Sequence, residues 1–209
     1  MSKLSELSDR VVRGYAGARG PELRLHPDAK SFNMRFPIIM KDVQKLFDEL
    51  FDDSSSNVLE HLNNDLTKII KLVGDIQNQK TNVKADMTDW FMQRKYKIFN
   101  FVGDIAIKLA QEASPYEGQF ELYDIWGVVY KRDNFTKPHD HWPHPWSFSY
   151  YVKSDGTTPI MFPETFPGYL YPKTNDMVLF PGIIRHSVPF HKSDEERIIV
   201  SGNINIKYS

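Results

Sequence analysis

The spacing of apolar residues changes from a helical to a strand-like period near residue 115. Before that point, apolar side chains recur every three to four positions, which predicts amphipathic helices over 41–51, 57–76 and 88–113. A short strand containing Pro37 is predicted over 32–40, and the polar stretch 77–87 is expected to connect two helices. Residues 1–30 show no sustained period, so we expect them to form a flexible N-terminal arm.

Beyond residue 117, short apolar segments alternate with turns rich in Pro, Gly and Asp. Strands are predicted in FELYDIWGVVY, SFSYYV, TPIMF, MVLF and RIIVSGNINI. Many short strands without intervening helices are typical of a sandwich, jelly roll or barrel. We therefore expect an α+β fold with a mainly β core. Helices over 41–113 would buttress a β core over 118–207, within a single domain spanning 31–209.

The composition narrows the range of functions. The 26 Lys and Arg balance 27 Asp and Glu, so nothing favours non-specific nucleic-acid binding. Cysteine is absent, which excludes disulfides, thiolate nucleophiles and cysteine metal ligands. No apolar run approaches the roughly 20 residues of a membrane-spanning helix, and the N-terminus lacks a signal-peptide core. We expect a cytoplasmic protein with neither a membrane nor a nucleic-acid partner, and the amphipathic helices leave a homodimer open.

The densest group of reactive side chains lies in the stretch 130–146, YKRDNFTKPHDHWPHPW. In an extended chain, residues i and i+2 point to the same side, so His139 and His141 can direct their imidazoles at one point. Neutral imidazole is a good ligand for iron, zinc, copper and nickel. Two ligands are too few for a stable site. His186, which follows a strand and a Pro-Gly turn in VLFPGIIRHSVP, is therefore the candidate third ligand.

A charged residue in an apolar strand is the second candidate feature. Arg197 follows His186 by 11 residues and begins the segment RIIVSGNI. An arginine on a buried strand is unfavourable unless an anion pairs with it. Because guanidinium binds carboxylates in bidentate geometry, its partner is either an internal Asp or Glu or a small acidic ligand.

These residues together resemble the prolyl-4-hydroxylase-type pattern of the iron(II)/2-oxoglutarate dioxygenases. The pattern is carried by Tyr130-x8-His139-x-His141, the distal His186 and Arg197. The segment 122–206 is also similar to a branch of 2-oxoglutarate/iron oxygenases of phages and marine bacteria. The resemblance implies a double-stranded β-helix, also called a jelly roll or cupin-like fold. It further implies an enzyme that uses Fe(II), 2-oxoglutarate and O2, and that hydroxylates a primary substrate which the sequence does not identify.

The resemblance assigns roles to individual residues. His139 matches the proximal iron ligand and His186 the distal one. Arg197 matches the residue that holds the far carboxylate of 2-oxoglutarate, and Tyr130 matches a strand residue whose hydroxyl supports that co-substrate.

The chain departs from the family pattern at two positions. His141 stands where an acidic ligand is common, which gives a three-histidine site unless Asp140 bends inward. Ile199 stands where a serine is usual, so Ser201, which has the same strand parity as Arg197, is expected to supply a hydroxyl, with Tyr130 or Ser149 as alternatives. Candidate pocket or lid residues are Trp126, Asp140, Trp142, Trp146 and Ser149.

Two other functions fit parts of the sequence. A three-histidine cupin-type dioxygenase or isomerase would use no 2-oxoglutarate, but it would leave Arg197 without a role. A non-catalytic jelly-roll binding module would carry an incidental or structural metal, and it predicts scattered histidines and no buried arginine.

Overall fold

The computed structural model describes residues 37–50, 57–74, 81–114, 117–165 and 168–207. The predicted arm 1–30 and the beginning of the predicted strand 32–40 lie outside these ranges. The described helices are α2 (Val43–Leu50), α3 (Val58–Val73), α4 (Met92–Lys95) and α5 (Ile98–Ala113). None of the helices in these ranges combines the length and the apolar character needed to cross a membrane.

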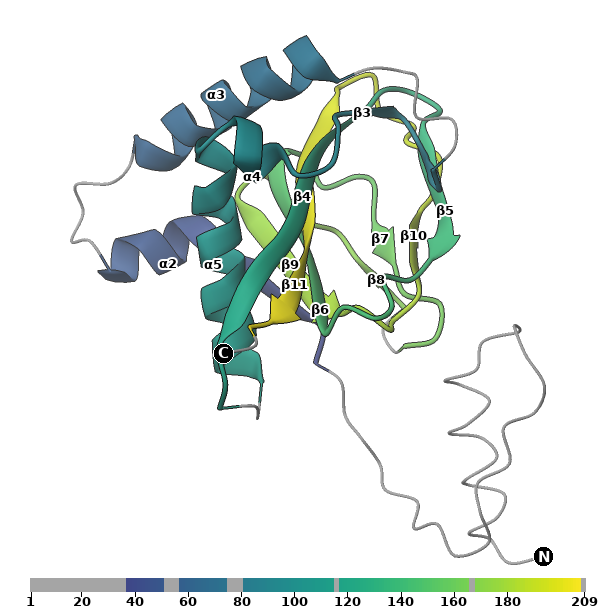
Figure 1. Ribbon diagram of the computed structural model, residues 1–209. Coiled ribbons are helices and arrows are strands. Elements are labelled where there is room, and N and C mark those ends of the chain that lie inside the picture. Colours follow the sequence, from purple (N-terminus) through teal and green to yellow (C-terminus); the bar gives the residue numbers. More distant parts are fainter. Residues whose placement is uncertain (1–36, 51–56, 75–80, 115–116, 166–167, 208–209) are drawn as a thin grey trace, which may run out of the picture. The chain divides into compact units, whose positions relative to one another are not determined.

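Two antiparallel sheets make up the β core (Figure 1). The larger has the strand order β1-β9-β6-β11-β4-β3, and the smaller has the order β2-β5-β10-β7-β8. The strands are β1 (Ile39–Asp42), β2 (Val83–Lys84), β3 (Asp86–Met87), β4 (Phe120–Tyr130), β5 (Phe135–His139), β6 (Trp146–Lys153), β7 (Ile160–Met161), β8 (Tyr169–Leu170), β9 (Asp176–Pro181), β10 (His186–Val188) and β11 (Arg197–Ile206). The predicted α+β fold with a mainly β core is confirmed.

The two faces of the larger sheet pack against different partners. One face contacts α3 and α5, which lie together on that side in Figure 1. Strand alternation explains the division, because Ile125 and Val129 of β4 belong to the helix-side core, whereas Trp126, Val128 and Tyr130 belong to the core between the sheets.

Helix α3 approaches the larger sheet closely at Gly127. A Cβ atom at this position would lie 2.4 Å from a side-chain carbon of Ile70, so only glycine allows the observed packing. The helices therefore buttress the sheet from outside, and the face between the sheets is left to form the site.

The structure corrects the predicted elements in the first half of the chain. The predicted helix 88–113 is two helices, because Tyr96 is extended between α4 and α5. The predicted connector 77–87 contains β2 and β3, which pair with β5 and β4. Within the described part of the predicted strand 32–40, strand β1 begins at Ile39 rather than at residue 37, and it pairs with β9. For β1, β2 and β3, backbone pairing with a distant segment overrides the local pattern.

Candidate metal centre and its cavity

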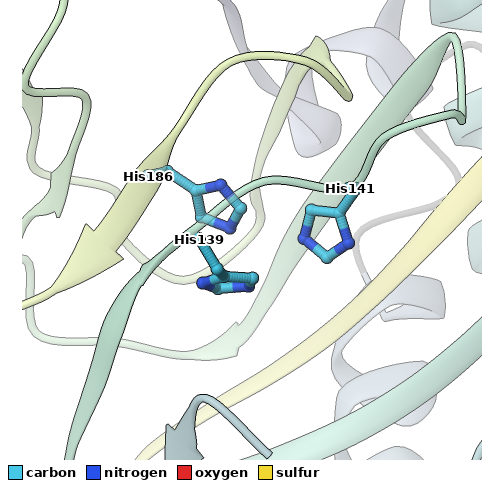
Figure 2. A group of neighbouring side chains, drawn as sticks. All are labelled: His139, His141 and His186. Atoms are coloured by element: carbon cyan, nitrogen blue, oxygen red, sulfur yellow. The ribbon is translucent and has the colours of Figure 1, made fainter. Parts of the chain in front are cut away.

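Three histidines converge between the two sheets. His139, His141 and His186 each offer one ring nitrogen, and these nitrogens all lie within 4.8 Å of one another (Figure 2). His139 ends β5 and His186 begins β10, where the two residues are direct cross-strand partners. His141 lies two residues beyond the end of β5, in the loop that leads to β6.

The loop that carries His141 is fixed against Gly182. The backbone N–H of His141 donates to the Gly182 carbonyl at 2.7 Å, and the Gly182 N–H donates to the Pro145 carbonyl at 3.1 Å. A Cβ atom at position 182 would lie 2.1 Å from the carbonyl oxygen of His144, so the loop and the turn after β9 can meet only because this residue is glycine.

The rings of His139 and His186 are oriented by backbone carbonyls. Nδ1 of His139 lies 2.8 Å from the Lys137 carbonyl, and Nδ1 of His186 lies 3.4 Å from the Ile184 carbonyl. Because a carbonyl only accepts, these contacts place the ring proton on Nδ1 and leave the Nε2 lone pair for a metal.

Burial favours the neutral form of all three imidazoles. It lowers the pKa of His139, lowers that of His186 well below its usual value, and lowers that of His141 to about 3. The nearby histidines add to the shift at His141 and His186. Since metals bind the deprotonated ring nitrogen, the cluster is ready to coordinate at neutral pH.

Asp140 lies outside the histidine cluster. Its side chain is exposed, and its carboxylate accepts a hydrogen bond from the backbone N–H of Trp142 at 3.2 Å. The candidate donor set therefore consists of three neutral nitrogens. Trp142 is 70% exposed and does not line the cavity described below. The prediction of Trp146 as a lid residue is wrong, because it begins β6 and is buried in the helix-side core.

Arg197 is buried without a carboxylate partner among the described residues. It is 1% exposed and lies opposite Tyr130 on β4. Its Nη2 donates to the Tyr151 hydroxyl at 3.3 Å, and the guanidinium carbon lies 5.4 Å and 5.0 Å from the ring centres of Tyr130 and Tyr151. Nε and Nη1 are buried and have no hydrogen-bond partner in the part of the chain that the structure describes. Buried donors are rarely left unpaired, so this side chain fits an anionic ligand rather than an internal ion pair.

One narrow cavity joins Arg197 to the histidines. Two of the five predicted pocket or lid residues, Trp126 and Ser149, line it, together with the candidate ligands and apolar side chains from both sheets. The lining residues are Val83, Trp126, Val128, Tyr130, Thr136, His139, His141, Phe148, Ser149, Tyr151, Ile160, Phe180, His186, Val188, Arg197, Ile199 and Ser201. The structure therefore brings the candidate metal ligands and the candidate anion-binding residue to the same enclosed space.

Thr136 is one of the cavity residues that the sequence did not indicate. Its hydroxyl lies 2.6 Å from the Tyr130 hydroxyl. Four residues of β5 (136 to 139) oppose three of β10 (186 to 188), which marks a bulge. Because the bulge inserts one residue, Thr136 and His139 line the same cavity despite their odd spacing. No local signal would have revealed this shift.

Comparison with known proteins gives similarity in structure only. No family model and no curated protein matches the sequence. The structure is similar to the viral collagen prolyl hydroxylase vCPH from Paramecium bursaria Chlorella virus-1 with 2-oxoglutarate bound, at a TM-score of 0.52 and 16% identity over 68% of this chain and 90% of that one. It is also similar to a Pseudomonas putida prolyl-4-hydroxylase, at a TM-score of 0.53 and 12% identity over 73% and 88% of the two chains.

A third similar structure is HygX from Streptomyces hygroscopicus with nickel and 2-oxoglutarate bound, at a TM-score of 0.50 and 10% identity over 73% of this chain and 78% of that one. At these identities the similarity establishes a shared fold. The predicted double-stranded β-helix, the fold of these oxygenases, is confirmed.

Proposed function

We propose that this protein is an Fe(II)- and 2-oxoglutarate-dependent dioxygenase that hydroxylates a primary substrate. The observation that carries the proposal is the unpaired, buried guanidinium of Arg197 in the cavity that three convergent histidines also line. Similar solved structures hold 2-oxoglutarate or a transition metal, which supports the same assignment.

His139, His141 and His186 would hold the metal through one ring nitrogen each. Three neutral imidazoles suit Fe(II), and they leave coordination positions open for small oxygen ligands. Bound there, Fe(II) would supply the redox chemistry that couples decarboxylation of 2-oxoglutarate by O2, giving succinate and CO2, to hydroxylation of a substrate C–H bond.

The protein's own residues bind and orient the co-substrate. Arg197 would form charge-assisted hydrogen bonds to the far carboxylate of 2-oxoglutarate through Nε and Nη1, the two nitrogens that have no partner. The rings of Tyr130 and Tyr151 hold the guanidinium in place. Val128 and Ile199 line the same space and exclude water, which strengthens the interaction between the charges.

Both alternative functions leave an observation without a role. A three-histidine dioxygenase or isomerase that uses no 2-oxoglutarate has no use for a buried cation beside the metal. A binding module with a structural metal has no use for an enclosed cavity that reaches the metal ligands. Dependence on 2-oxoglutarate separates the proposal from both.

The decisive experiment follows succinate formation from 2-oxoglutarate by the purified protein with Fe(II), ascorbate and O2, without added substrate. We expect slow, metal-dependent succinate formation that is lost in Arg197→Met and retained in Arg132→Met, since Arg132 is a half-exposed arginine paired with Asp194. In parallel, calorimetry without O2 should show 2-oxoglutarate binding to the Ni(II)-loaded protein. Absence of both succinate and binding would overturn the proposal.

A further inference from the structure

Two serine hydroxyls meet on the wall of the cavity. Ser149 of β6 and Ser201 of β11 are cross-strand partners, and their Oγ atoms lie 2.8 Å apart. Both side chains line the cavity, at 6% and 8% exposure. The pair carries two hydroxyl hydrogens, and their mutual bond uses one of them. Neither hydroxyl has another hydrogen-bond partner among the described residues, so one donor remains for a ligand in the cavity.

The serine pair lies at a different end of the cavity from Arg197. Ser201 follows Arg197 by four positions along β11, which corresponds to about 13 Å of extended backbone. The guanidinium packs against Tyr130, the residue directly opposite Arg197, and against Tyr151, the residue opposite Ile199, so these ring contacts lie before Ser201 along β11. The guanidinium and the serine pair therefore lie at different levels along β11.

Ring contacts place the histidines at the serine end. Trp126 lies directly opposite Ser201 on β4, and its ring centre is 5.9 Å from that of His141. Phe180 is paired with the residue two before Ser149 on β6, and its ring centre is 4.6 Å from that of His186. The serine pair therefore lies on the part of the cavity wall whose aromatic neighbours contact the metal ligands.

We propose that the Ser149–Ser201 pair hydrogen-bonds the metal-binding keto-acid end of 2-oxoglutarate, and not the far carboxylate that Arg197 holds. From the sequence, we expected Ser201 to replace the usual serine at position 199 and to act together with the arginine. The geometry instead favours a role for Ser201 at the end of the co-substrate that binds the metal. This inference rests on the proposed function. In this role, the two serines are positioning residues: they orient the end of 2-oxoglutarate that binds the metal.

A double-mutant cycle tests the proposal with 2-oxoglutarate and the Ni(II)-loaded protein in the absence of O2. The four proteins are the wild type, Ser149→Ala/Ser201→Ala, Arg197→Lys and the combination of all three substitutions. Loss of a hydrogen bond to a charged ligand should weaken 2-oxoglutarate binding about tenfold in the serine variant. Because the two sites hold different ends, the combined variant should be weakened by the product of the separate factors. A combined variant no weaker than Arg197→Lys alone would overturn the proposal.

Pyruvate provides a second probe, because it has the keto-acid end but lacks the far carboxylate. In competition with 2-oxoglutarate, we expect the serine substitutions to weaken pyruvate about tenfold and Arg197→Lys to leave its affinity unchanged. Pyruvate affinity that is insensitive to the serines would also overturn the proposal. If the double variant does not fold, Ser201→Ala alone serves in both measurements.

Ser147→Ala is the matched control. This serine lies on the same strand at 1% exposure, but its hydroxyl donates to Asn203 and it does not line the cavity. We expect its 2-oxoglutarate affinity to equal that of the wild type, and Ni(II) affinity to be unchanged in all serine variants. A wild type that binds no 2-oxoglutarate would refute the proposed function itself. Normal wild-type binding with unaffected serine variants would refute only the role of the serines.

Discussion

His139 and His186 are direct cross-strand partners, and their ring centres lie 4.4 Å apart. Backbone pairing between β5 and β10 therefore fixes two of the three candidate ligands relative to each other. The third, His141, belongs to a loop whose position depends on backbone contacts with Gly182. Strand pairing therefore holds the ring nitrogens of His139 and His186 rigidly, and the loop supplies the third nitrogen, from His141.

Gly182→Ala should disturb the third ligand while leaving the pair intact. The new Cβ would lie 2.1 Å from the His144 carbonyl, so the loop must move away. We expect Ni(II) affinity to fall at least about tenfold and the free energy of unfolding to fall by about 1–3 kcal/mol. Metal titration and urea unfolding measure the two effects.

Gly168→Ala is the control. The nearest contact of its new Cβ would be 3.4 Å away, so the Ni(II) affinity and the free energy of unfolding should both stay near their wild-type values. Unchanged metal binding in Gly182→Ala would show that the loop does not position His141.

Single substitutions should separate the metal ligands from a neighbouring histidine. We expect alanine at position 139, 141 or 186 to reduce Ni(II) affinity at least about 100-fold, because each removes one of three ligands. His144→Gln should retain affinity within a factor of about three. The Nδ1 of His144 is 2.7 Å from Asn205 and its ring packs on Tyr123, which accounts for this side chain structurally. Metal content after dialysis gives the result, and full retention by any of the three alanine variants would remove that residue from the site.

The metal-free protein should lose stability as the pH falls. The pKa of His141 is about 3 in the folded protein and 6.5 in the unfolded chain, so the unfolded chain binds more protons between these values. The free energy of unfolding therefore rises with pH between about 3 and 6.5. The contribution of His141 to it is lost as the pH falls through the same range. His141 contributes a slope of about 1.4 kcal/mol per pH unit between pH 4 and 5.5.

Urea unfolding with a chelator at pH 4.5, 5.5 and 7 measures this dependence. We expect His141→Asn to make this dependence shallower by the contribution of one histidine. An unchanged slope in His141→Asn would mean that His141 is protonated in the folded protein.

Arg197→Met should stabilise the metal-free protein while removing 2-oxoglutarate binding. A buried guanidinium with two unpaired nitrogens is unfavourable, and methionine fills similar volume without a charge. We expect the free energy of unfolding to rise by about 1–3 kcal/mol, as measured by urea denaturation. Arg132→Met, at a half-exposed position, should change it by less than about 0.5 kcal/mol. A large loss of stability in Arg197→Met would instead indicate that the arginine serves the fold.

The strands of the second half and the main candidate residues could be predicted from the sequence. The segments FELYDIWGVVY and RIIVSGNINI are rich in β-branched and aromatic residues, and the observed β4 and β11 have the same bounds as these segments. The pair His139 and His141 and the apolar surroundings of Arg197 are local features of the same kind. Each of these features depends on the local backbone geometry of one short segment, so the sequence alone was sufficient to identify these residues as candidates.

Only the tertiary structure decided which of these residues meet and what each one contacts. Strands β2 and β3 consist of two residues each and exist because distant strands offer hydrogen bonds to them. The bulge in β5 brings Thr136 into the cavity, and the register of β6 and β11 pairs Ser149 with Ser201. The absence of a carboxylate beside Arg197 among the described residues is likewise a property of the assembled cavity. Such relationships arise between segments far apart in the chain, where local periodicity carries no information about register, bulges or unpaired charge.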